Sequence, residues 1–98
     1  MLFLIVTEDG PDGERIRRTT REAHLAYLKD AGARLKFAGP LLDEKDAPTG
    51  SVIVIEAASE TAAQLFAEND PYAKAGLPAR RTIRPIRAVL GEWPALDE

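Results

Sequence analysis

The chain has no cysteine among its 98 residues, and it contains a single histidine. The lack of cysteine excludes disulfides and thiolate chemistry. With one His and no acidic cluster at the spacing of a calcium loop, we expect no metal site. The glycines of "GPDGE" at 10–14 match no phosphate-binding loop, and no Gly-x-Ser-x-Gly motif occurs. The sequence therefore predicts neither a metal nor a cofactor.

The chain also lacks a basic excess and a long hydrophobic run. Its net charge is −3, which argues against a nucleic-acid partner. The opening "MLFLIVT" is too short to cross a bilayer, and it has no basic leader or cleavage site. We therefore expect no membrane association, and a cytoplasmic location by default. The length predicts one domain spanning 1–98.

Hydrophobic periodicity and turn residues divide the chain into alternating strands and helices. Gly32 is expected to end the first helix, and Ser59 to cap the second. A further short helical turn fits 71–77. We expect strands at 2–7, 33–39, 51–57 and 79–90, helices at 14–31 and 59–69, and a tail at 91–98.

The resulting β-α-β-β-α-β order predicts an α+β fold of the ferredoxin-like type. Right-handed crossovers would place both helices on one face of a four-stranded antiparallel sheet. In this topology the first and third strands are central, which agrees with their continuous apolar runs. Pro85 falls in the fourth strand, where an edge tolerates a residue without an N–H group.

The two central strands are apolar on both faces, whereas the helices can cover only one face. A second copy packed sheet against sheet would bury the other face, so we expect a homodimer of the dimeric α/β-barrel kind. The alternative is that the tail 91–98 covers this face alone. With one Trp and one Leu, the tail offers little apolar surface for that purpose.

The only histidine, His24, lies within the first predicted helix. At about 100° per residue it falls near the middle of the less polar stripe, with Arg17 and Arg21 beside it. An imidazole in that position loses water and needs a partner. The periodicity alone favours a core histidine that is satisfied by a backbone carbonyl or a buried water.

Asp70 precedes Pro71, a pattern typical of a helix N-cap followed by proline at the first helical position. The fold also permits a second role, because the end of the second helix can approach the first. A carboxylate within reach of His24 would fix the imidazole tautomer and favour a general base near neutral pH. The separation of 46 positions leaves this contact undecided. Ser51 and Tyr72 are possible hydroxyl neighbours, but neither has the signature of a nucleophile.

Four segments together resemble the YCII-related domain family. They are "REAHLAYL" at 21–28, "FAGPLLD" at 37–43, "GSVIVIEA" at 50–57 and "NDPYAKAGL" at 69–77. The resemblance covers nearly the whole chain in the same order. The family is similar to the dimeric α/β-barrel group, which includes muconolactone isomerase-like proteins, and this agrees with the expected homodimer.

The resemblance implies an active site built on a pair formed by His24 and Asp70. It also implies that a small-molecule pocket is lined by a Gly39-Pro40 turn, Ser51 and Tyr72. The implied chemistry is that of a cofactor-free lyase or isomerase acting on oxidised aromatic compounds. Two alternatives remain open at this point. The chain could be a non-catalytic small-molecule-binding or accessory dimer, or a dimer in which the pair only stabilises helix packing.

Overall fold

The computed structural model describes residues 1–94, so the last four residues of the predicted tail 91–98 lie outside the described part. A short 3₁₀ helix at Gly32–Arg34 follows the first α-helix. The elements in chain order are β1 (Leu2–Asp9), α1 (Gly13–Asp30), β2 (Leu35–Leu42), β3 (Pro48–Glu56), α2 (Glu60–Glu68), α3 (Pro71–Lys74) and β4 (Pro78–Ile86).

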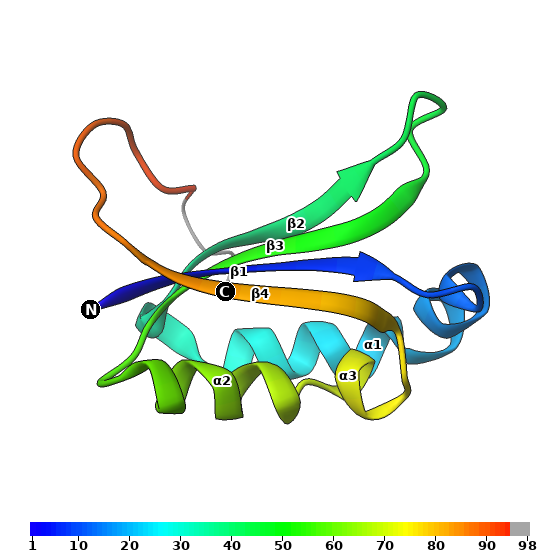
Figure 1. The fold of residues 1–98 in the computed structure, drawn as a ribbon, viewed down its shortest axis with the longest axis horizontal. Helices are drawn as coiled ribbons and strands as arrows, with labels where there is room; N and C mark the ends of the chain where they lie inside the picture. The colour runs from blue at the N-terminus through cyan, green and yellow to red at the C-terminus, as the bar shows by residue number, and fades with distance from the viewer. Residues whose placement is uncertain (95–98) are drawn as a thin grey trace.

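The four strands form one antiparallel sheet in the order β2-β3-β1-β4. Figure 1 shows all three α-helices on the same face of this sheet. The predicted ferredoxin-like fold, with β1 and β3 in the centre, is confirmed. α3 packs beside α1. The first residues of α3 therefore lie close to the side of α1 that faces the sheet.

The core lies between the helices and the facing side of the central strands. Alternate residues of β1 and β3 point into it, because successive side chains of a strand face opposite ways. Phe3 and Ile5 pack there with Ile53 and Ile55, against Phe66 of α2. Burial of each such side chain contributes about 1.5–3 kcal/mol. This core sets the spacing between α1 and β3. The candidate site lies in the same layer, between the helix and the sheet.

The ends of the first helix follow local signals. No Gly or Pro interrupts Glu14–Lys29, and Lys29 in the last turn complements the helix dipole. Gly32 has a φ of +60°, which favours glycine, and it follows directly on the C-cap residue Ala31. The predicted role of Gly32 as the helix stop is confirmed. Ser59 caps α2 as predicted, since its side chain accepts a hydrogen bond from the Ala62 N–H.

The predicted Gly39-Pro40 turn is wrong. Both residues lie inside β2, where Gly39 faces Val52 and Pro40 faces Ser51 across the sheet. The chain reverses later, between Asp43 and Ala47. The Asp43 carboxylate accepts from the N–H groups of Lys45 and Ala47, at 2.7 and 3.0 Å. β2 is an edge strand, and it can therefore hold a proline without breaking the central ladder.

The last strand is shorter than predicted, because β4 ends at Ile86 rather than at residue 90. Pro85 lies near this end, opposite Phe3 of β1. β4 is an edge strand, as the position of Pro85 predicted. After Ile86 the chain leaves the sheet, and Figure 1 shows it rising on the side away from the helices.

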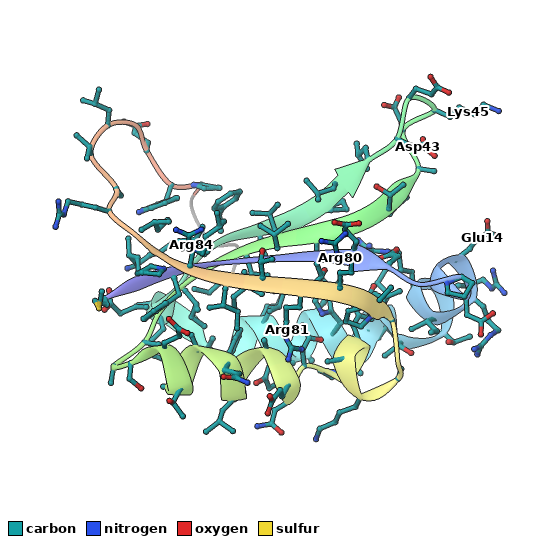
Figure 2. All side chains as sticks on the ribbon, viewed as in Figure 1. Glu14, Asp43, Lys45, Arg80, Arg81 and Arg84 are labelled. Carbon is teal, nitrogen blue, oxygen red and sulfur yellow. The ribbon has the colours of Figure 1, made fainter. Side chains whose placement is uncertain are left out.

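The helix-free face of the sheet carries apolar side chains on its central strands, and Arg80 and Arg84 of the edge strand β4 lie on the same face (Figure 2). Leu4, Val6 and Val52 lie on this face and are half-buried. The described part of the tail covers the β2 side, where Trp93 stacks on Phe37 with ring centroids 5.7 Å apart. The segment that joins β4 to this tail exposes 77% of Val89 and 95% of Leu90. The described residues of the tail therefore leave Leu4, Val6 and Val52 partly exposed.

Candidate active site

The structure brings His24 of α1 and Asp70, at the start of α3, into direct contact. The distance from His24 Nδ1 to Asp70 Oδ1 is 2.8 Å, and the two residues are only 9% and 6% exposed. Asp70 also caps α3, because the same oxygen accepts from the Tyr72 N–H at 2.9 Å. The local role and the long-range role of this carboxylate therefore coexist.

The contact with Asp70 determines which imidazole nitrogen is free. A carboxylate accepts hydrogen bonds and does not donate them, so the neutral ring of His24 carries its proton on Nδ1. The lone pair then lies on Nε2, where it can accept a proton. This is the tautomer that a general base requires.

Tyr72 covers one face of the His24 ring. The two rings stack with centroids 3.9 Å apart and an interplanar angle of 17°. Burial raises the pKa of the Tyr72 phenol above its usual value near 10, while the cations of Arg17 and Arg21 lower it less strongly. The phenol is therefore protonated at neutral pH, and it can donate a hydrogen bond beside the imidazole.

A second, largely buried hydrogen-bond network ties α1 to β1 and β3 beside the site. Arg17 of α1 forms two hydrogen bonds with Asp9 at the end of β1, at 2.7 and 3.0 Å. The same guanidinium donates to the Gly50 carbonyl at 2.7 Å and to the Ser51 hydroxyl at 3.0 Å. The hydrogen bond to Asp9 raises the pKa of Arg17, so this cation is permanent. Because Ser51 accepts from Arg17, its own proton is free to donate to a ligand.

Sequence reasoning placed Arg17 beside His24 but missed Asp9. Asp9 stands in "EDGPDG", which the pattern predicts to be a loop. In the structure β1 continues to this residue, and its carboxylate points at the first turns of α1. An acidic residue next to a turn resembles ordinary surface charge, so the sequence contains no local signal for the pair.

Gly50 is required because the backbone of β1 comes close to it. A Cβ atom at position 50 would lie 2.3 Å from the carbonyl oxygen of Thr7. The Gly50 carbonyl is also an acceptor for Arg17. The Gly-Ser pair of β3 therefore combines close strand packing with the tie to α1.

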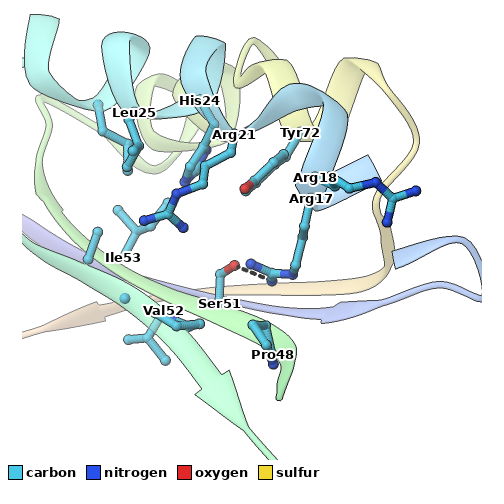
Figure 3. Close-up of a pocket in the computed structure, with 14 residues that line it drawn as sticks. Arg17, Arg18, Arg21, His24, Leu25, Pro48, Ser51, Val52, Ile53 and Tyr72 are labelled. Carbon is cyan, nitrogen blue, oxygen red and sulfur yellow. Dashed lines mark hydrogen bonds between the residues drawn. The ribbon is translucent and has the colours of Figure 1, made fainter. Parts of the chain in front are cut away.

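A cavity of about 380 Å³ lies between α1 and the β2–β3 edge of the sheet. His24 and Tyr72 line it from the helix side, as Figure 3 shows. Gly39, Pro40 and Ser51 line it from β2 and β3. Asp70 does not line this cavity and lies against it only through His24. Five of the six site residues predicted from the sequence thus line the same cavity. The sixth, Asp70, forms a hydrogen bond with the imidazole of His24.

The described residues 1–94 contain no group of three or more His, Asp or Glu side chains that could hold a metal ion. Over the same range, no helix combines the length and the apolar character needed to cross a membrane. The cavity is large enough for a monocyclic organic compound.

The model of the YCII-related domain matches residues 1–87, almost the whole described chain. The chain belongs to the YCII-related family. Protein YciI from Escherichia coli O6:H1 is 38% identical to this chain. The matched region covers 91% of this chain and 99% of the relative. The resemblance drawn from the four sequence segments is therefore confirmed.

Two of the solved structures that match this chain differ widely in sequence identity. One is 5-chloro-2-hydroxyhydroquinone dehydrochlorinase (TftG) from Burkholderia phenoliruptrix AC1100, in complex with 2,5-dihydroxybenzoquinone. It is 40% identical with a TM-score of 0.80, covering 89% of this chain and 94% of that chain. An antibiotic biosynthesis monooxygenase, 17% identical with a TM-score of 0.54, shares the fold over 92% of this chain and 100% of its own.

Proposed function

We propose that this YCII-related protein is a cofactor-free acid–base enzyme of the lyase or isomerase type, acting on a small oxidised aromatic compound. One observation carries the proposal. The Nδ1 atom of His24 is bound to Asp70 at 2.8 Å, and the imidazole lines a cavity of about 380 Å³. A histidine that served only to pack the helices would have no need of such a cavity.

In the proposed reaction His24 Nε2 takes a proton from a C–H or O–H group of the substrate. The Asp70 carboxylate stabilises the imidazolium that forms, because the two groups are in contact and nearly buried. The electron pair of the broken bond stays on the substrate. In an elimination it becomes a new π bond, while a group such as chloride leaves with the electron pair of its own bond to carbon. In an isomerisation the imidazolium returns the proton to another atom.

The likeness to TftG supports the lyase alternative and supplies the first compound to assay. That protein is named as a dehydrochlorinase of 5-chloro-2-hydroxyhydroquinone. Loss of HCl fits the proposed step, since one proton goes to the base and chloride leaves with the electron pair of the C–Cl bond. We therefore propose a chlorinated hydroxyhydroquinone as a first test substrate for this chain.

The test compares the wild-type protein with His24→Asn. The side-chain amide of asparagine can donate to Asp70 from nearly the position of Nδ1, but it offers no base where Nε2 was. We expect chloride release with the wild type, and a loss of about 100-fold or more in the variant. Melting temperature should change little, because the buried carboxylate keeps a donor.

Two results would contradict the proposal. One is a His24→Asn variant that retains the wild-type rate. The other is a wild-type protein that neither releases chloride nor exchanges ring protons of hydroxyhydroquinones with deuterated solvent. The protein could also fold, bind such compounds equally well with and without His24, and convert none of them. That result would favour the alternative function, a small-molecule-binding or accessory dimer.

We also propose that the working form is a homodimer joined through the helix-free face of the sheet. Half-buried Leu4, Val6 and Val52 give this face the apolar surface that a second copy would cover. Light scattering should report about twice the chain mass of 10.7 kDa. The mass of a single chain at micromolar concentration would contradict the proposal, and Val6→Glu should shift a dimer toward that mass.

A further inference from the structure

Three arginines of α1, at positions 17, 18 and 21, line the cavity, and two of them are already paired. Arg17 is committed to Asp9, with which it shares two hydrogen bonds. Arg18 lies 3.9 Å from Glu14, and Figure 3 shows its guanidinium pointing away from the cavity. Arg17 is therefore held by Asp9, and Arg18 is directed away from a ligand in the cavity.

Arg21 differs from its two neighbours. It forms no ion pair or hydrogen bond with any residue in 1–94, although it lines the cavity. In Figure 3 its side chain extends from α1 toward β3, between His24 and Leu25. A guanidinium in this position has its N–H donors available to a bound molecule.

The rest of the lining leaves Arg21 without a competing charge. No Asp or Glu lines the cavity among the described residues, and the Asp70 carboxylate lies outside it. The remaining wall is mostly apolar, with Leu25, Leu28 and Ile53 among its members. Arg21 is exposed in the free protein, and a ligand that covers the apolar walls would shield its guanidinium from water and so strengthen a charged hydrogen bond. A ligand that fits this cavity is therefore a compact ring molecule with at least one anionic oxygen.

We infer that Arg21 binds an ionised oxygen of the substrate, so that the site selects small ring compounds carrying an enolate, phenolate or carboxylate. The inference rests on the proposed function in one respect, which is that this cavity is the substrate site. Arg21 would hold the anionic oxygen while His24 Nε2 faces the proton to be removed. Ser51, whose hydroxyl proton is free, can donate to a second oxygen of the same ligand.

The test measures equilibrium binding rather than turnover. The probe is 2,5-dihydroxybenzoquinone, whose enolic hydroxyls are vinylogous carboxylic acids and are ionised at neutral pH. Its neutral counterpart is 2,5-dimethoxybenzoquinone, which has the same ring. Benzoate serves as the carboxylate probe, so that the preferred kind of anionic oxygen is read from the same titrations. Calorimetry with each compound at low and at high salt gives the affinities.

We expect Arg21→Gln to weaken binding of the dihydroxyquinone by about ten- to a hundredfold, the range for a charged hydrogen bond. Arg21→Lys should recover part of this loss, and high salt should weaken the wild type more than the variant. Binding of the dimethoxy compound should change less than about twofold. Arg15→Gln is the matched control, since Arg15 lies on the same helix, pairs with Asp12 at 3.4 Å and does not line the cavity.

Equal losses for the charged and the neutral compound in Arg21→Gln would overturn the inference, as would a wild type without preference for the anion. The result for His24→Asn separates this inference from the proposed function. If that variant keeps the anion preference and also keeps full turnover, the general-base proposal fails and the role of Arg21 stands. If turnover needs His24 but Arg21→Gln leaves anion binding intact, only the role of Arg21 fails.

Discussion

The buried pair between Arg17 and Asp9 leads to a quantitative prediction for Asp9→Asn. The side chains of Arg17 and Asp9 are 14% and 8% exposed, and two hydrogen bonds join them. The substitution keeps the shape of the side chain but removes its charge. The guanidinium is then left with neutral acceptors only, namely the new amide, the Gly50 carbonyl and the Ser51 hydroxyl.

An uncompensated charge at this level of burial costs about 3–5 kcal/mol. The amide oxygen still accepts one hydrogen bond, so we take the lower end, about 3 kcal/mol. A domain of this size has a free energy of unfolding of about 5–15 kcal/mol. At about 4–8 °C per kcal/mol, the melting temperature should fall by roughly 12–24 °C.

Thermal and urea unfolding of four proteins would check this value: the wild type, Asp9→Asn, the double variant Asp9→Leu with Arg17→Met, and Glu14→Gln. The double variant removes both charges and should recover most of the lost stability. Glu14→Gln is the matched control, because Glu14 is 98% exposed and 3.9 Å from its partner, and it should unfold like the wild type. A loss in Asp9→Asn no larger than in the control would refute the reasoning, as would a double variant as unstable as Asp9→Asn.

Two further predictions concern stability and titration. Gly50→Ala should lower the free energy of unfolding by about 1–3 kcal/mol or more, because the new Cβ would lie 2.3 Å from the Thr7 carbonyl oxygen. In Gly39→Ala the new Cβ meets nothing within 4 Å, so the urea midpoint should stay nearly unchanged. Burial raises the pKa of both tyrosines, Tyr27 and Tyr72, above their usual value near 10. The stability that this shift provides is complete below pH 10 and is lost as pH rises through the raised values. An absorbance titration of the folded protein that matched the urea-unfolded chain would contradict this.

The fold was predictable because its signals are local and agree with one another. The apolar runs of β1 and β3 are continuous, and Gly32 and Ser59 mark helix ends that the structure confirms. The turn at Gly39-Pro40 was wrong for a physical reason. Gly and Pro favour turns, but an edge strand also accepts them, and the Asp43 carboxylate closes the hairpin a few residues later. The pairing of β2 with β3 overrides the local preference.

The candidate site was predictable only in part. Helical periodicity places His24 toward the interior, but a carboxylate 46 residues away is visible only through the family resemblance. The ion pair between Asp9 and Arg17 could not be predicted from the sequence. It depends on how far β1 extends and on where α1 lies relative to the end of that strand. Ion pairs of this kind follow from tertiary geometry, and no spacing rule along the chain describes them.

The turn at residues 70–72 explains how one histidine can be oriented without a larger set of supporting residues. Asp70 is held in place by the hydrogen bond that its Oδ1 accepts from the Tyr72 N–H, so the turn itself orients the oxygen that His24 contacts. Pro71 fixes the backbone between them, which lowers the entropy lost on ordering the turn. Tyr72 then stacks on the imidazole face, while Asp70 takes Nδ1 in the ring plane. Three consecutive residues thus restrain both the tilt and the rotation of the ring, and Nε2 is left as the nitrogen available to the cavity.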